Sequence, residues 1–581
     1  MRRRDLFKAV AGLAMIPVMG VRALAAPFRR VRPGDAAWPK ASDWEALRKQ
    51  VGEALIRPEP LHGPYDNPFN IGDQAAGTQV SGWLNAWKPG ISAYAVKARG
   101  GEDVAAAVDF ARRHKLRLVV KGGAHSYQGT SNAPDSLLVW TRAMNRVQLI
   151  DGFTPEGCSD APVPAVSVEA GAMWIDVYDA VTTKGGRYAQ GGGCTTVGVA
   201  GHVQSGGFGS FSKRWGTAAG SVLEAEIVTA DGTLRRVNKC RDPELFWGIK
   251  GGGGGSLGVV TRLILRTHDL PEFFGGAFAT IRANSDEAYR RLITRFFDFY
   301  AEALYNPHWG EQARLRGDNR LEISMVCQGL TAEEAKAVWK PFLDWLAASP
   351  GDYGFDEDFW AGASVARAWW DAEARRKRGS TAMVSDDRPG ASAAHVWWRG
   401  DQEQCSVFLY GYESLWLPGS LLDSARRPAL VEALMAASRH KKVELHFNKG
   451  LGGGDVEMAA LARDTATNPE AADAFALAII ADGGPSRFPG MPDARDEEKA
   501  RQAAAAVDAA TAILAPLAPA GGSYVSESNF FNKSWARSFW GSNYPRLLAA
   551  KRRYDPDGLF FVHHGVGSED WSADGFTRDA T

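Results

Sequence analysis

The sequence predicts an α+β protein built from two domains. A chain of 581 residues is longer than one hydrophobic core normally supports, and its 45% hydrophobic content is enough to fill two. Glycine-rich loops follow short strand patterns up to about residue 266, whereas longer helical patterns replace them from residue 267. We therefore expect a first domain over residues 90–266 and a second over residues 267–520.

The first domain has the pattern of an α/β nucleotide-binding unit. A strand-like run at 94–97, a helical stretch at 102–114 and an apolar strand at 116–120 lead directly into a glycine loop. Residues 223–237 predict a β-hairpin with an Asp231-Gly232 turn, and 257–266 predict another strand. Neither a G-x-G-x-x-G fingerprint in its usual place nor a phosphate loop ending in Gly-Lys-Ser/Thr is found.

The second domain alternates helices with strands. Helical patterns at 285–304, 331–348 and 427–437 alternate with strand-like runs at 321–327, 406–412 and 474–481, and residues 501–514 form an Ala-rich helix that ends at Pro516. This mixture predicts an antiparallel sheet backed by helices.

The overall charge excludes some classes of partner. Lys plus Arg and Asp plus Glu number 67 each, so the protein has no net positive field for nucleic acid or for an anionic membrane. A small-molecule substrate is the expected partner.

The N-terminus has the order of a twin-arginine export signal. Arginines at positions 2–4 precede an apolar run at 9–21 and the small-residue site Ala23-Leu24-Ala25. The apolar run is too short to span a bilayer comfortably, so we expect no stable membrane insertion; an uncleaved amphipathic anchor is the alternative. We expect residues 1–26 to be removed after Ala25 or Ala26, residues 27–89 to form an N-terminal extension, and the mature protein to be periplasmic or secreted.

Five cysteines occur in the chain: Cys158, Cys194, Cys240, Cys327 and Cys405. An oxidising periplasm would permit disulfides among them. The sequence does not say which cysteines pair.

Two glycine-rich stretches each contain one nucleophilic side chain. His125 lies within residues 122–127 and Cys194 within residues 193–202. Glycine lets backbone N–H groups approach a pyrophosphate, whereas imidazole nitrogen and thiolate sulfur could add to the 8α-methyl and C6 positions of an isoalloxazine ring. The alternatives are a hydrogen-bonded structural histidine and half of a disulfide. The pattern suggests a doubly tethered flavin.

Four sequence blocks carry a family resemblance. They are 121–129, 194–209, 242–260, and Asn543-Tyr-Pro-Arg-Leu547 followed by Lys551 and Tyr554-Asp-Pro556. In these blocks the chain resembles the berberine-bridge-enzyme-like FAD-linked oxidases of the vanillyl-alcohol-oxidase and p-cresol-methylhydroxylase (PCMH) group, in their bicovalent form. The resemblance implies a PCMH-type FAD-binding domain over 90–266, a substrate-binding domain over 267–520, and a segment 521–581 that returns to the FAD domain.

The resemblance also implies the cofactor site. FAD would be attached covalently through His125 and Cys194, and His202 would contact the ribityl region, with a buried structural histidine as the alternative. No metal site is expected. The expected FAD-binding residues are Lys121, Gly122, Gly123, Ala124, Ser126, Gly129, Thr195, Val197, Gly198, Gly201, His202, Gly206, Gly207, Gly209, Gly255, Gly258, Val260, Asn543 and Tyr544.

The catalytic base is expected in the C-terminal segment. Carbohydrate-oxidising relatives carry Tyr-x-Asn-Tyr there, whereas this chain has Tyr524-Val-Ser-Glu527. A carboxylate in a dry cleft can abstract a proton, so Glu527 is the candidate base with Tyr524 as helper or substitute; a solvated Glu527 is the alternative. Alkaloid-type members place an acid on the strand at 475–479, where this chain has Ala476 and Ala478 at the equivalent positions.

These features predict an exported FAD-dependent oxidase. A hydride would pass from an alcohol or hemiacetal carbon of a sugar or other small hydroxylated substrate to flavin N5, and O2 would reoxidise the flavin to give H2O2. Val197 matches a position where small aliphatic residues accompany oxygen access. The alternatives are a dehydrogenase that passes electrons to a periplasmic carrier and a non-catalytic flavin-containing binding protein.

Overall fold

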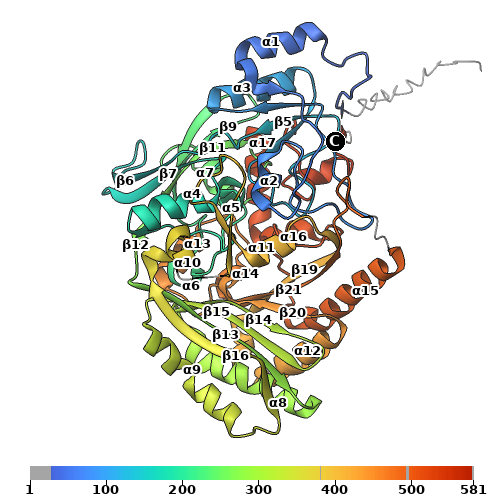
Figure 1. The fold of residues 1–581 in the computed structure, drawn as a ribbon. Coiled ribbons are helices and arrows are strands. Elements are labelled where there is room, and N and C mark those ends of the chain that lie inside the picture. The colour runs from blue at the N-terminus through green and yellow to red at the C-terminus, as the bar shows by residue number, and fades with distance from the viewer. Residues whose placement is uncertain (1–27, 378, 380, 493–495, 579–581) are drawn as a thin grey trace, which may run out of the picture.

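The computed structural model describes residues 28–377, 379, 381–492 and 496–578. The expected export signal 1–26 and its cleavage site lie outside the described residues. Figure 1 shows a half that contains several small sheets above a half dominated by one large sheet. The predicted α+β fold of two domains is confirmed. No helix within the described ranges is both long and apolar enough to cross a membrane.

Two sheets form the first half. The four-stranded sheet has the order β2-β3-β5-β4, with β3 and β4 both parallel to β5, and the five-stranded sheet has the antiparallel order β10-β9-β11-β7-β6. Their bounds are β2 Leu55–Ile56, β3 Tyr94–Lys97, β4 Arg117–Lys121, β5 Ser136–Trp140, β6 Val147–Phe153, β7 Val163–Glu169, β9 Val222–Val228, β10 Leu234–Asn238 and β11 Val259–Arg266. The expected strands and hairpin of this domain are observed.

Short helices surround these two sheets. Apolar positions of α3, among them Val104, Val108 and Phe110, are buried in the core of this half, as the helical pattern at 102–114 predicts. The helices are α1 Ala41–Val51, α2 Pro68–Asp73, α3 Gly101–Arg113, α4 Trp174–Tyr178, α5 Val199–Gln204, α6 Ser212–Trp215 and α7 Pro243–Ile249.

A seven-stranded antiparallel sheet dominates the second half, in the order β16-β13-β15-β14-β20-β21-β19. Its strands are β13 Phe273–Ala283, β14 Trp309–Leu315, β15 Arg320–Gln328, β16 Tyr353–Val365, β19 Phe408–Pro418, β20 Val443–His446 and β21 Ala474–Gly484. The predicted strands at 321–327, 406–412 and 474–481 lie within or overlap β15, β19 and β21.

Helices cover one face of this sheet (Figure 1). They are α8 Asp286–Phe299, α9 Ala332–Ala347, α12 Arg427–His440 and α15 Glu497–Leu514. Fully buried aromatic side chains such as Phe296, Trp339 and Phe342 fill the layer between helices and strands. The opposite face of the sheet is therefore turned toward the first half of the molecule.

Shorter elements complete the chain. The remaining helices are α10 Ala372–Lys377, α11 Arg399–Gln404, α13 Val456–Arg463, α14 Glu470–Asp473, α16 Trp535–Trp540 and α17 Tyr544–Tyr554. Three two-stranded sheets pair β1 Phe28–Arg29 with β22 Thr577–Arg578, β8 Arg187–Tyr188 with β12 His268–Asp269, and β17 Met383–Ser385 with β18 Val396–Trp398.

The C-terminal segment packs back onto the first half. Leu118 of β4 forms a parallel bridge with Phe560. The Lys551 ammonium, on α17, pairs with Asp555 at 2.6 Å and donates to the carbonyls of Ser256 and Phe560 at 2.7 Å each. These contacts bring the segment after residue 520 back to the glycine loops.

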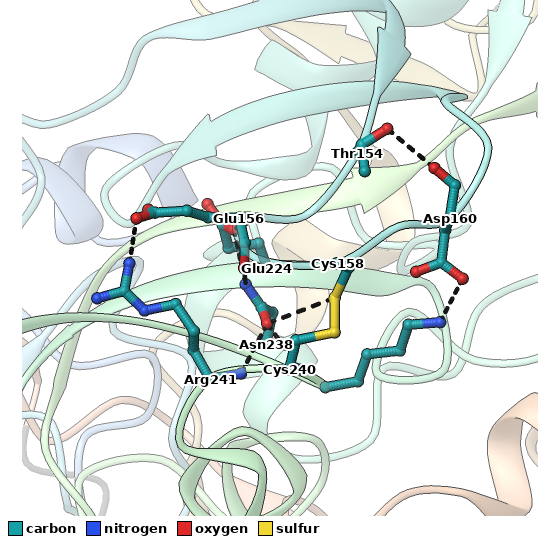
Figure 2. Close-up of a disulfide and its surroundings, with 9 residues drawn as sticks. Thr154, Glu156, Cys158, Asp160, Glu224, Asn238, Cys240 and Arg241 are labelled. Atoms are coloured by element: carbon teal, nitrogen blue, oxygen red, sulfur yellow. Dashed lines mark hydrogen bonds and ion pairs between the residues drawn. A yellow bond between two sulfur atoms is a disulfide. The ribbon is translucent and has the colours of Figure 1, made fainter.

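A disulfide links Cys158 to Cys240, which are 82 residues apart in sequence. Figure 2 shows it beside the Glu156–Arg241 ion pair and the Asn238 side chain. Cys194, Cys327 and Cys405 are free thiols. The pairing that the sequence left open thus joins the loop between β6 and β7 to the segment that follows β10, and Cys194 keeps its thiol.

Candidate active site

A cavity of about 1760 Å³ separates the two halves. Backbone of the glycine loops forms one wall, and side chains from β14, β15, β19, β20 and β21 form the other, together with the turn at 524–527. A cavity of this size exceeds the range typical of small-ligand pockets, which is about 300–1,000 Å³. It can hold a long cofactor and a substrate together.

The two glycine-rich loops touch each other because both lack side chains at the contact. A Cβ on Gly123 would lie 2.6 Å from the Gly198 nitrogen, and a Cβ on Gly198 would lie 2.7 Å from the Gly123 nitrogen. The His125 Nε2 atom is also hydrogen-bonded to Thr196 Oγ1 across the loops at 3.0 Å. Glycine at both positions therefore brings His125 and Cys194 to the same wall of the cavity.

His125 is held as a neutral imidazole. Burial lowers its pKa to about 4, because the charged form would lose its hydration. The hydrogen bond to Thr196 uses Nε2 and does not involve the Nδ1 atom of His125. A neutral ring whose Nε2–H donates to Thr196 keeps the lone pair of Nδ1 available as a nucleophile.

His202 lines the cavity but uses both ring nitrogens within the protein. Trp174 Nε1 donates to its Nδ1 at 3.0 Å, and its Nε2 bonds to the Phe208 carbonyl at 2.9 Å. These contacts require a neutral ring that carries its proton on Nε2, and burial lowers the pKa of His202 to about 4. The histidine can present its ring face to a ligand, but not a free nitrogen.

Most of the predicted site residues lie on the cavity wall. Those that do are Gly122, Gly123, Ala124, His125, Ser126, Cys194, Val197, Gly198, Gly201, His202, Gly255, Gly258, Val260, Tyr524 and Glu527. Ala124 adopts a left-handed backbone conformation with φ of 67°, and a Cβ at Gly201 would meet nothing within 4 Å. The loops thus offer open backbone along one side of the cavity.

The other predicted residues do not line the cavity: Lys121, Gly129, Thr195, Gly206, Gly207, Gly209, Asn543 and Tyr544. The Lys121 ammonium donates to the carbonyls of Gln74 and Ala75 instead. A Cβ on Gly209 would lie 1.6 Å from the Gly191 carbonyl oxygen, so this glycine permits a backbone contact. These residues support the loops from behind.

Polar side chains at three of these positions have other partners. Thr195 Oγ1 donates to the Val396 carbonyl at 2.6 Å. Asn543 Nδ2 donates to the Thr467 carbonyl at 2.9 Å, and the Tyr544 hydroxyl bonds to Glu569 at 2.6 Å. After the turn at 524–527, the residues of the C-terminal segment that line the cavity are Trp540 and 561–565.

Glu527 forms an ion pair with Lys449 in the cavity. The side chains are only 20% and 12% exposed, so the predicted alternative of a solvated Glu527 does not describe this carboxylate. Ser414 of β19 holds the turn, because its hydroxyl accepts from the Tyr524 N–H at 3.2 Å and donates to the Glu527 carbonyl. Neither Lys449 nor Ser414 belongs to a motif that sequence reasoning could find.

Three phenols line the cavity near Glu527: Tyr524 is buried, and Tyr127 and Tyr412 are half-buried. The rings of Tyr127 and Tyr412 are 5.3 Å apart between centroids. Burial raises the pKa of each phenol, and the negative charge of Glu527 adds to this effect. They can donate hydrogen bonds to a ligand, but they are not poised to ionise.

Strands β14, β20 and β21 supply a charged wall. Glu444 pairs with Arg314 at 3.3 Å and with Lys442 at 2.6 Å. Burial opposes its ionisation, but the His446 ring, whose Nε2 lies 3.8 Å from Glu444 Oε2, and these cations hold the pKa of Glu444 below its usual value. The wall can recognise a polar, hydroxylated molecule.

The stretch of β21 that should carry an acid in alkaloid-type relatives, residues 475–479, has none. Ile479 and Ala481 line the cavity, whereas Ala476 and Ala478 pack in the core toward the helices. These two alanines therefore do not reach the cavity, because adjacent residues of a strand point to opposite faces.

The cavity also contains buried polar atoms without a protein partner in the described part of the chain. Gln128 Oε1, Ser256 Oγ and His564 Nδ1 lie beside the glycine loops, and Asp401 Oδ2, His446 Nδ1 and Asn448 Oδ1 lie elsewhere along the cavity. Unpartnered buried polar atoms are costly unless a ligand or water satisfies them. Open glycine backbone and these atoms fit a long ligand with phosphate and hydroxyl groups, as FAD has.

Two family models match the chain. One, described as "FAD binding domain", matches residues 92–238, and the other, described as "Berberine and berberine like", matches residues 523–567. The first covers the loops that carry His125 and Cys194, and the second covers the turn that carries Tyr524 and Glu527. The matched segments meet at the cavity.

Relatives extend the similarity over almost the whole chain. The VAO-type flavoprotein oxidase VAO615 of Thermothelomyces thermophilus is 28% identical over 596 residues, which cover 95% of each chain. The crystal structure of the VAO-type flavoprotein MtVAO615 from Myceliophthora thermophila C1 has a TM-score of 0.74 at 25% identity and covers 95% of this chain and 100% of that one.

A more distant structure shares the fold. The glucooligosaccharide oxidase of Acremonium strictum, whose FAD is described as 6-S-cysteinyl and 8α-N1-histidyl, has a TM-score of 0.64 at 17% identity. The match covers 90% of this chain and 98% of that chain.

Proposed function

The chain belongs to the berberine-bridge-enzyme-like FAD-linked oxidoreductases of the vanillyl-alcohol-oxidase and PCMH family, and we propose that it oxidises an alcohol or hemiacetal carbon of a small hydroxylated substrate, with O2 as the electron acceptor. One observation carries this proposal. Two nucleophilic side chains, His125 and Cys194, lie on the backbone wall of a cavity whose other side holds the Glu527–Lys449 pair.

FAD would lie along the glycine loops. Backbone around Gly122, Gly123 and Gly198 would approach the cofactor, while the free atoms of Gln128 and Ser256 would take up its polar groups. When bound, the flavin supplies hydride acceptance and electron transfer to oxygen. The protein supplies binding, orientation and proton handling.

We propose that the cofactor is attached at both nucleophiles. His125 is neutral and has its Nε2 engaged by Thr196, which leaves Nδ1 for a bond, and Cys194 is a free thiol on the same wall. The A. strictum oxidase, which shares the fold, carries one histidyl and one cysteinyl link. Two bonds would fix the cofactor against the substrate wall.

Glu527 is the proposed base for the substrate hydroxyl proton. Its pair with Lys449 keeps the carboxylate close to a cation that can orient the substrate oxygen, and the phenols of Tyr127, Tyr412 and Tyr524 can hydrogen-bond neighbouring hydroxyls. The charged wall around Glu444 favours a polyhydroxylated substrate such as a sugar over an apolar one.

The expected acceptor is O2, and a periplasmic electron carrier is the alternative. Val197 lines the cavity and matches a position where small aliphatic residues accompany oxygen access in the family. We further propose that the protein works outside the cytoplasm, because residues 1–26 have the order of a twin-arginine signal and the Cys158–Cys240 disulfide suits an oxidising compartment.

The test begins with the visible spectrum of the purified mature protein, followed by acid denaturation. We expect a yellow chromophore that stays with the polypeptide, and reduction by a sugar or alcohol in the absence of oxygen. Rapid mixing of the reduced protein with air should restore the oxidised spectrum and release H2O2. Slow reoxidation by air but fast reoxidation by an artificial electron acceptor would instead favour the dehydrogenase.

A further inference from the structure

The segment that packs against Cys194 comes from the substrate domain. Thr195 Oγ1 donates to the Val396 carbonyl at 2.6 Å, and Trp398 Nε1 donates to the Gly193 carbonyl at 3.1 Å. The two hydrogen bonds flank Cys194 on either side. They fix the start of α11, which carries Asp401, against the loop that holds the thiol.

Asp401 is a buried carboxylate close to this contact. The Asp401 side chain belongs to a residue that is only 8% exposed, it lines the cavity together with Cys194, and the carboxyl and the thiol each affect the pKa of the other. Its Oδ2 atom has no partner among the described residues. A buried carboxylate oxygen without a donor is costly and requires a proton or a ligand group.

A second carboxylate in this part of the cavity is already engaged. Glu311 Oε1 bonds to Ser210 Oγ and accepts from Asn448 Nδ2 at 3.3 Å. Asp401 is therefore the carboxylate that is free to accept a proton from the thiol.

The thiol needs such an acceptor. Burial, and then the negative charge of Asp401, raise the pKa of Cys194 well above its usual value, so almost no thiolate exists beforehand at neutral pH. Burial raises the pKa of Asp401 to about 6, which makes it a stronger proton acceptor than an exposed aspartate while it remains ionised at pH 7.

We propose that Asp401 is the base that takes the Cys194 proton when the thiol bonds to the flavin, so that the substrate domain completes the cofactor attachment of the first domain. This inference rests on the Cys194–flavin bond proposed above. It assigns the attachment step to a residue outside the matched sequence blocks.

In the attachment step a bond forms between Cys194 Sγ and a flavin ring carbon, the S–H bond breaks, and its proton goes to Asp401. The C–H bond at that carbon also breaks and its hydrogen leaves as a proton, while two electrons remain on the flavin. Molecular oxygen removes the two electrons, together with two protons, and forms one H2O2 per bond made.

The readout is whether Cys194 is free in the purified full-length protein. Denatured protein is alkylated with iodoacetamide, digested, and the Cys194 peptide is analysed by mass spectrometry. We expect a flavin-bearing peptide in the unsubstituted protein, and an alkylated peptide for most of the Asp401→Asn protein. Asp401→Asn should stay yellow after acid denaturation through His125, which shows that it has folded and bound FAD.

Two variants serve as controls. Asp401→Glu keeps a carboxylate and should restore most of the Cys194–flavin peptide. Glu403→Gln removes an exposed carboxylate of the same helix that also borders the cavity, and it should leave the bond intact. If Asp401→Asn forms the bond as completely and as fast as the unsubstituted protein, the inference is overturned.

The pH dependence of bond formation tests the same inference without any substitution. Full-length protein produced without flavin is mixed with FAD in air, and the rate at which Cys194 becomes blocked is measured. Below about pH 6 the rate should fall about tenfold per pH unit as Asp401 takes up a proton. A rate that does not decline there contradicts the role of Asp401, whereas a Cys194 that never becomes blocked contradicts the proposed bond itself and the inference with it.

Discussion

The two walls of the cavity are built in opposite ways. The cofactor wall consists of backbone and neutral side chains: glycines that touch across two loops, and two histidines whose pKa values are both lowered to about 4. The substrate wall carries ion pairs such as Glu527–Lys449 and Glu444–Arg314. One wall is shaped by the absence of side chains, and the other is shaped by their charge.

This difference suggests that the two walls have different tasks: one binds the cofactor, and the other binds the substrate and moves protons. A wall of backbone can approach a large cofactor closely and holds it in one place, because glycine removes the Cβ that would keep it away. A wall of paired charges can bind hydroxyl groups and move protons, and its members can change without disturbing the cofactor. Exchanging residues on each wall should therefore give different kinds of defect.

The largest effect is expected when both nucleophiles of the cofactor wall are removed. His125→Ala combined with Cys194→Ala should release all of the flavin on acid denaturation, because no covalent bond remains. Each single variant should retain it through the other residue. Flavin fluorescence of the denatured polypeptide measures this, and bound flavin in the double variant would contradict both assignments.

On the substrate wall, Glu527→Gln should slow flavin reduction about 10²- to 10⁴-fold, which is the usual contribution of a general base. The absorption spectrum and flavin content should not change, so the defect would be confined to one wall. Anaerobic stopped-flow reduction measures the rate. Asp482→Asn, which removes a carboxylate from the other cavity pair Lys441–Asp482, is the matched control. A full rate in Glu527→Gln would sink the base assignment.

Outside both walls, the Cys158–Cys240 disulfide should affect stability alone. The double substitution Cys158→Ser and Cys240→Ser should lower the free energy of unfolding by about 2–5 kcal/mol, because it frees a long loop in the unfolded chain. Denaturant unfolding measures the change, and a thiol reductant should destabilise the unsubstituted protein but not the variant. A loss of covalent flavin would mean that the disulfide and the cavity are coupled.

The smallest effect concerns the neutral state of the cofactor wall. Burial lowers the pKa of His202 to about 4, so between pH 6.5 and pH 4 the unfolded chain binds a proton that the folded protein does not. As the pH falls through this range, the free energy of unfolding should decrease by about 1.4 kcal/mol per pH unit because of His202 alone. His202→Gln should reduce the slope by that amount, as denaturant unfolding at pH 6 and pH 5 can measure.

The sequence revealed the cofactor wall better than the substrate wall. His125 and Cys194 lie in short glycine-rich runs, so their chemistry can be read locally. Lys449 and Asp401 come from separate stretches of the second half and meet the site only through the sheet and the contacts of Val396 and Trp398. No local pattern marks them.

The sequence also did not show which residues of a buried strand face the cavity. Strand β21 was found from its apolar run, but a run that is buried on both faces does not tell which residues face the cavity. For this reason the sequence could not show that Ala476 and Ala478 pack in the core while Ile479 and Ala481 line the cavity. Lys121 was similarly grouped with its neighbours, although its ammonium binds carbonyls of the N-terminal extension.

The return of the C-terminal segment to the first half has a consequence for synthesis of the protein on the ribosome. The bridge from Leu118 to Phe560 and the contact of Lys551 with Ser256 require residues that are made long after β11 is finished. At translation speeds of about 5–20 residues per second the delay is on the order of 15 to 60 s. During that time the unfinished half exposes the surface that these residues will cover, so we expect nascent chains to need chaperones and a fragment that ends at residue 266 to aggregate.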